Sequence, residues 1–245
     1  MKTQLNGKLI DSLNGSGFAL LPGYNCSPLS NDDFVGAIEL YLQHYEGYFR
    51  PINLVHVHSD DHSVIGCNVC CQLTERHNEA VDVLHRMTSS IGMTTRAAPR
   101  KERMVGNNDR ILEPCDFSAI IQKANRTDIK LGFDFSIVDP FAKSFSRLDF
   151  AEIVKRREAE KIQKYDQYCK ENHVNFSPIV FSALGMASDN AVSKIKDLLK
   201  KRPDLGSLVI QKINLVILKY GGRAVMKYYG LDKHQRRANY NSIQN

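Results

Sequence analysis

Two aspartates stand inside apolar stretches of this 245-residue chain, where a charged side chain is costly to bury. Asp116 lies in EPCDFSAII at 113–121, and Asp134 lies in KLGFDFSIVDP at 130–140. Two carboxylates on neighbouring strands can share one Mg²⁺ or Mn²⁺, which takes oxygen ligands together with a substrate phosphate. The pair therefore predicts a metal site that activates water against a phosphodiester. The alternative is that both aspartates lie at strand ends and contact only water.

Further charged side chains can complete such a site. Lys161 and Lys164 lie three positions apart on one expected helix, next to Tyr165. An ammonium group beside the carboxylates would stabilise charge on a phosphodiester or orient the nucleophile. Glu79, on an earlier expected helix, is the candidate third carboxylate of the cluster.

The elements that must position these residues alternate between helix and strand. Apolar residues at helical spacing, followed by Gly92 as a stop, predict a helix that begins near Glu75. Strands are expected at 93–99, 113–121, 130–140 and 175–185, and further helices at 148–173, 188–203 and 207–229, the last split by Gly221-Gly222. Three successive strands before a helical crossover predict an α/β fold with a mixed sheet and helices against it.

The composition and the punctuation of the chain suggest four parts. We expect an N-terminal extension with one helix at 1–54, a zinc knuckle at 55–74, an α/β domain at 75–205, and a C-terminal helix with a basic tail at 206–245. No apolar run reaches the roughly 18 residues that span a bilayer, and the N-terminus lacks the apolar core of a signal peptide. We therefore expect an intracellular protein without a membrane partner. A location in the nucleus rather than the cytoplasm is a separate expectation.

A short segment rich in His and Cys is the candidate zinc site. His56, His58, His62 and Cys67 fall within it, and the last two have the H-x4-C spacing that closes a zinc knuckle. Zinc accepts imidazole and thiolate ligands alike in tetrahedral sites. The next cysteines along the chain are competing ligands. A strand LVHVHS with its histidines facing water is the alternative.

Basic side chains form three clusters in a chain of net charge +6, at 96–103, 154–164 and 233–238. Such clusters favour a nucleic-acid partner, although a solvated surface is the simpler explanation of any single one. The candidate nucleic-acid contacts in the first two clusters are Arg100, Lys101, Arg103, Arg156 and Arg157.

The order of these elements, with PCD on the second strand and FDFSIV on the third, resembles the PD-(D/E)XK restriction-endonuclease-like fold, an αβββαβ core. More narrowly, residues 55–205 resemble the restriction-like endonuclease domain at the C-terminal end of non-LTR retrotransposon reverse transcriptases and related mobile-element proteins. The matching pieces are DDHSVIGC, RHN, PCDF, DFSIVDP, EKIQKY and FSPIVFSALG. The resemblance implies a metal-dependent DNA endonuclease with a zinc knuckle upstream.

The resemblance also implies roles for single residues. Asp116 corresponds to the first metal ligand and Asp134 to the second, whereas the usual lysine two positions later is Ser136 here. In the retrotransposon branch the following helix supplies that lysine, so EKIQKY makes Lys161 or Lys164 the surrogate.

The RHN at 76–78 matches the helix-start motif of the same branch. Arg76, His77 and Asn78 are therefore expected to support nucleic-acid binding, with Asn78 as a helix cap in the alternative. Because Ser136 departs from the general pattern, two other functions stay open. One is a catalytically inactive protein that binds DNA or RNA on the same fold, and the other is a structural component of a nucleoprotein assembly.

Overall fold

The computed structural model describes residues 64–66, 71–97, 103–105, 111–122, 128–140, 142–145 and 147–228. The expected N-terminal helix, the zinc ligands His56, His58, His62 and Cys67, and the basic tail lie outside these residues, as do Arg100 and Lys101. Those expectations stay predictions.

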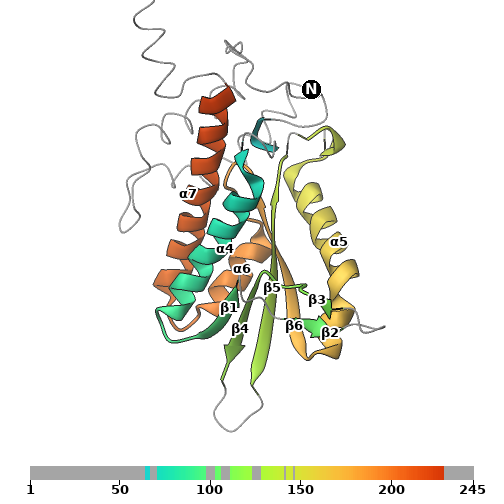
Figure 1. Ribbon diagram of the computed structural model, residues 1–245, viewed down its shortest axis with the longest axis vertical. Coiled ribbons are helices and arrows are strands. Elements are labelled where there is room, and N and C mark those ends of the chain that lie inside the picture. The colour runs from blue at the N-terminus through green and yellow to red at the C-terminus, as the bar shows by residue number, and fades with distance from the viewer. Residues whose placement is uncertain are drawn as a thin grey trace, which may run out of the picture.

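A four-stranded mixed sheet lies at the centre of the fold (Figure 1). Its strands are β1 (Thr94–Ala97), β4 (Phe117–Ile121), β5 (Ile129–Val138) and β6 (Val174–Ser182), in the order β1-β4-β5-β6. The β1–β4 and β4–β5 pairs are antiparallel, and β5–β6 is parallel. A parallel pair needs a long crossover, and here the helix α5 (Phe150–Glu171) supplies it. The expected α/β fold with a mixed sheet is confirmed.

In the described part of the chain, four α-helices cover the two faces of this sheet. Helices α4 (Leu73–Ser89), α6 (Asp189–Leu198) and α7 (Pro203–Tyr228) share one apolar core with the sheet, whereas α5 packs on the other face (Figure 1). Short elements complete the described part: the 3-10 turns η2 (Val64–Gly66) and η3 (Lys143–Phe145), and the small pair β2 (Met104–Val105) with β3 (Ile111–Leu112). Among the described helices, none is both long enough and apolar enough to cross a bilayer.

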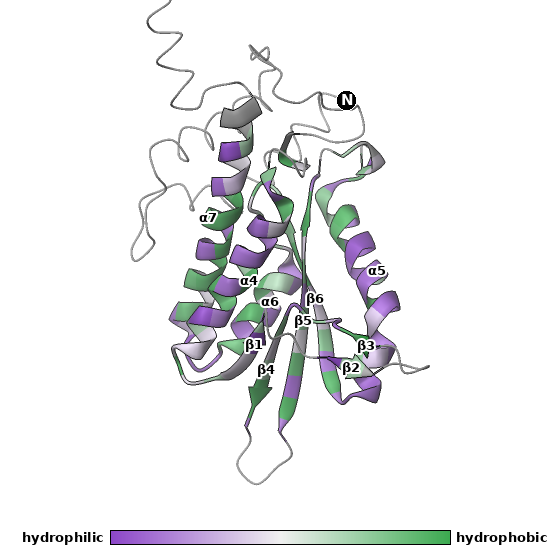
Figure 2. Cartoon of the chain, viewed as in Figure 1, coloured by the Kyte–Doolittle hydropathy of each residue, from purple (hydrophilic) through white to green (hydrophobic). Residues whose placement is uncertain are grey.

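The alternation of β5 decides which side chains meet which helices. Successive residues of a strand point to opposite faces. Phe133 and Phe135 therefore lie in the core with α4, α6 and α7, while Val138 packs with α5. Hydrophilic and hydrophobic residues alternate along β5 in Figure 2. Asp134 and Ser136 have the parity of Val138 and thus belong to the α5 face.

The start of α5 is fixed by a capping box. Asp149 Oδ1 accepts a hydrogen bond from the Glu152 amide at 2.8 Å, and Glu152 Oε2 accepts one from the Asp149 amide at 2.9 Å. Phe150 and Ile153 then anchor the first turns against Val180 of β6. These contacts fix how α5 is rotated about its axis, and hence which of its later residues face the sheet.

The C-terminal helix corrects two expectations. Helix α7 runs without a break through Gly221-Gly222, where a split was expected, and the expected domain boundary at 205/206 falls inside it. Val209, Ile213 and Ile217 of α7 are buried in the core that also contains α4. The helix is therefore part of the α/β body and not an appendage to it.

Candidate functional site

The two aspartates come together across neighbouring strands. The antiparallel register pairs Phe117 with Phe133, so Asp116, one residue earlier, lies across from Asp134, one residue later. Side chains at such facing positions share a face of the sheet. Both aspartates are buried, with exposed fractions of 8% and 6%. The structure thus brings together the pair that the sequence singled out.

Lys161 of α5 supplies the positive charge beside Asp134. Its Nζ lies 2.8 Å from Asp134 Oδ2, and the two side chains are 15% and 8% exposed. The contact is therefore a largely buried ion pair between the ammonium and the carboxylate. Burial raises the pKa of Asp134, and the Asp116 carboxylate adds to that rise, whereas Lys161 and Arg157 oppose it.

Asp116 is held by two donors. The Phe135 amide donates to its Oδ2 at 2.9 Å, and the Nε2 of His77 lies 3.1 Å from the same atom. His77 Nδ1 lies 3.2 Å from the Asn78 side-chain oxygen. The contacts of the Phe135 amide and of His77 with Oδ2 fix the orientation of the Asp116 carboxylate.

At position 136, where the general motif has a lysine, this chain has a serine that contacts a cation of α5. Ser136 is buried, and its Oγ accepts a hydrogen bond from Arg157 Nε at 3.3 Å. Arg157 also pairs with Glu160 through Nη1 at 3.1 Å. Arg157 and Lys161 are four residues apart on α5, so both face the sheet. The helix thus provides the cations that the strand does not.

These groups line one pocket of about 450 Å³. Its wall combines carboxylates, a hydroxyl and cations with a few apolar side chains. The residues that carry its polar chemistry are Arg76, His77, Glu113, Asp116, Asp134, Ser136, Arg157 and Lys161. A polar pocket with three carboxylates and several cations suits a ligand that carries negative charge together with a metal ion.

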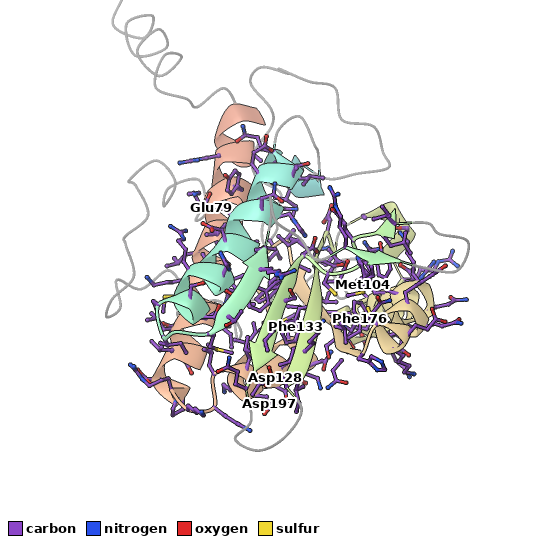
Figure 3. The ribbon with its side chains drawn as sticks, turned by 60° about the horizontal axis from the view of Figure 1, so that its bottom comes forward. Glu79, Met104, Asp128, Phe133, Phe176 and Asp197 are labelled. Carbon is purple, nitrogen blue, oxygen red and sulfur yellow. The ribbon has the colours of Figure 1, made fainter. Side chains whose placement is uncertain are left out.

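Two sequence candidates lie elsewhere. Glu79 is on the side of α4 that faces α7, where Lys219 and Tyr220 bind its carboxylate, the latter at 2.9 Å. Figure 3 shows it well away from Phe176, which lies beside α5. The expectation of Glu79 as third carboxylate is therefore wrong. Lys164 is exposed, with its Nζ 4.8 Å from the centre of the Tyr165 ring, and it is not part of the pocket wall.

The RHN segment lies inside α4. Arg76 is buried, donates to the Ile65 carbonyl at 3.1 Å and to Cys71 Sγ at 3.2 Å, and so ties the chain before α4 to the pocket wall. Burial lowers its pKa. Asn78 is the sixth residue of α4, so it is not a cap; the cap position belongs to Gln72.

The described cations of the two upstream basic clusters differ in position. Arg103 is exposed and pairs with Glu113 at 3.2 Å, at the edge of the pocket. Arg156 is 59% exposed and pairs with Glu160 at 3.3 Å, facing away from the pocket wall. Only Arg157 of that adjacent pair reaches the pocket.

The Ser136–Arg157 contact was not predicted from the sequence. Its signal was present: Ser136 shares the strand face of Asp134, and Arg157 shares the helix face of Lys161. What was absent was the crossover geometry that sets these two faces against each other.

The donor set limits what metal the pocket could hold. In the part of the chain that the structure describes, no group of three or more His, Cys, Asp or Glu side chains is arranged to bind a metal ion. Mg²⁺ often uses only one or two carboxylates and completes its shell with water and substrate phosphate. Asp116 and Asp134 are the two carboxylates that a hard cation of this kind would use, in competition with Lys161 for Asp134 Oδ2.

A scan against protein-family models and a search of curated proteins found no match to this chain.

Proposed function

We propose that this chain is a metal-dependent DNA endonuclease that hydrolyses phosphodiester bonds on a restriction-endonuclease-like αβββαβ core. The observation that carries the proposal is the meeting of Asp116, Asp134 and Lys161 in one polar pocket. The order of helices and strands supports it, because α4, β1, β4, β5, α5 and β6 follow the order of that core.

Asp116, Asp134 and Lys161 each have a separate role in the proposed reaction. Asp116 and Asp134 would hold Mg²⁺ or Mn²⁺, which supplies Lewis-acid stabilisation and a water of lowered pKa when bound. His77 and the Phe135 amide orient the Asp116 carboxylate toward the pocket that would hold the metal. Lys161 would place its ammonium beside the phosphate under attack, where negative charge develops.

The remaining parts of the proposal depend on the family resemblance. They are an origin in a mobile element, a zinc knuckle formed by His56, His58, His62 and Cys67, and a location in the nucleus. RNA is the alternative polymer, since the pocket contacts do not distinguish the two sugars.

The test is nicking of a supercoiled plasmid in Mg²⁺ or Mn²⁺. Asp116→Asn and Asp134→Asn each keep the side-chain shape but remove a carboxylate, and we expect each to lower the rate by about 10³-fold, the loss of several kcal/mol of stabilisation. Both variants should still bind a DNA duplex in fluorescence anisotropy. Glu79→Gln is the matched control, because this carboxylate lies on the α7 side. Nicking by either aspartate variant at the parent rate would contradict the proposal.

One observation favours a second function. Each carboxylate already has a cationic or donor partner, Lys161 for Asp134 and His77 for Asp116, so the folded pocket is electrostatically compensated without a metal. A non-catalytic nucleic-acid-binding protein, alone or within a nucleoprotein assembly, fits this arrangement. DNA binding without nicking by the parent chain in either metal would favour it.

A further inference from the structure

We infer that Arg157, oriented by Ser136, is the residue that grips a backbone phosphate of the nucleic acid inside this pocket. The inference rests on the proposed function and deepens it, because it names the group of the polymer that the pocket recognises and the side chain that recognises it.

Two of the three nitrogens of the Arg157 guanidinium donate hydrogen bonds to neighbouring side chains. Its Nε donates to Ser136 Oγ at 3.3 Å and its Nη1 to Glu160 at 3.1 Å. Among the described residues, no acceptor takes a hydrogen bond from Nη2. Arginine presents its donors in a rigid planar fork that suits phosphate oxygens. Two donors fix the plane of the fork, and the remaining edge is available to a ligand.

The surroundings of Arg157 make an anion a fitting ligand. The side chain lines the pocket together with Lys161 and both aspartates. With a cation on the aspartates, a phosphodiester could be bound by the metal on one side and by the guanidinium on the other. This division also gives Ser136 a role. A lysine at position 136 would contact the carboxylates directly. With the buried Ser136 there, Lys161 makes the contact with Asp134, and the serine hydroxyl orients Arg157.

The neighbouring residue provides a matched control. Arg156 and Arg157 are adjacent on α5, carry the same charge and pair with the same Glu160. Arg156 is 59% exposed and is not part of the pocket wall, whereas the Arg157 side chain is 38% exposed and lines it. Any effect of total charge or of Glu160 should therefore be common to both variants.

The experiment measures binding of a fluorescein-labelled DNA duplex and of its single strand by anisotropy, in EDTA, across a salt series. We expect Arg157→Met to weaken binding about tenfold to a hundredfold, the range for one charge-assisted hydrogen-bonding group, and to reduce the salt slope by about one. Arg156→Met should change affinity by no more than about twofold. Circular dichroism melting of each variant establishes that it is folded.

Ser136→Ala tests the orienting contact. Alone it should weaken binding about threefold to tenfold, as expected for one hydrogen bond. In the Arg157→Met background it should have no further effect on affinity, because the group that it orients is gone. An unchanged effect of Ser136→Ala in that background would overturn the orienting role.

The outcomes separate this inference from the proposed function. If the parent nicks plasmid but Arg157→Met binds and nicks like Arg156→Met, the inference is wrong and the endonuclease proposal stands. If Arg157→Met alone loses binding and no chain nicks, the phosphate contact is supported and the endonuclease proposal fails. A parent chain that binds neither DNA nor RNA overturns both.

Discussion

Replacing Lys161 by methionine tests whether the buried charge of Asp134 depends on this ammonium group. The two side chains are only 8% and 15% exposed, so the substitution leaves an anion in the pocket without its nearest cation. Removing one partner of a buried ion pair costs about 3–5 kcal/mol. For a chain of this size, about 3 kcal/mol lowers the melting temperature by roughly 6–12 °C. Lys164→Met, three residues along the same helix and exposed, should stay within about 0.5 kcal/mol of the parent.

The pH dependence of Lys161→Met has a definite sign. Burial raises the folded-state pKa of Asp134 above its ordinary value of 3.8, so the stability linked to this group is full below pH 3.8 and is lost as pH rises through the folded-state pKa. Lys161 lowers that pKa, so its removal raises the pKa further and extends the loss to higher pH. The variant should therefore be weakest relative to the parent near neutral pH and approach it in acid.

Thermal melts by circular dichroism from mildly acidic to neutral pH measure this difference. Adding Asp134→Asn to Lys161→Met should recover much of the lost stability, because both charges are then absent. An excess of Mg²⁺ should raise the melting temperature of Lys161→Met more than that of the double variant, since only the former keeps both carboxylates. If Lys161→Met and Lys164→Met melt alike at every pH, the reasoning is refuted.

Two further predictions concern residues outside the pocket wall. Gly132→Ala would place a methyl group against Cys115 Sγ and 2.8 Å from Val174 Cγ1. We expect the free energy of unfolding in urea to fall by about 1–3 kcal/mol, and Cys115→Ala to restore part of that loss. Equal stability of Gly132→Ala and the parent would contradict the overlap. Burial, followed by the Glu79 carboxylate, raises the pKa of Tyr220 to about 12 from 10.0, so the linked stability is present below pH 10 and is lost toward pH 12. In a difference absorbance titration, Glu79→Gln should shift one tyrosine to lower pH, and an identical titration of both proteins would contradict the assignment.

Local patterns predicted most of the element order. Ala80, Val83 and Leu84 recur at helical spacing and are buried in the core as expected. Ser188 caps α6 by accepting the Ala191 amide at 3.1 Å. Short-range rules succeed here because the responsible interactions lie within one or two helical turns.

The errors come from long-range packing. Gly221-Gly222 weakens a helix in isolation by about 1 kcal/mol per glycine, yet burial of Ile217 and Ala224 against the core outweighs this cost and keeps α7 continuous. Helical spacing likewise cannot tell which neighbour a face will meet, so Glu79 could not be assigned to α7.

The choice between the two lysines was also beyond the sequence. Three residues along a helix correspond to a rotation of about 300°, which leaves Lys161 and Lys164 about 60° apart. That angle is enough to send one side chain into the pocket and the other into solvent. Spacing placed both on roughly one side of α5, and only the packing of α5 on β5 and β6 separates them.

The capping box at Asp149 fixes where α5 begins, and hence the direction around the helix axis in which the Lys161 side chain points. Because Lys161 reaches Asp134 from a helix and not from the same strand, the loop between β5 and α5 can lengthen or shorten without displacing it. An insertion of one residue between the cap and Lys161 would instead swing the ammonium by about 100°. In descendants of this chain, the number of residues between Asp134 and Lys161 can therefore change through the loop. The spacing of eleven residues from Phe150 to Lys161 within α5 cannot change without moving the ammonium.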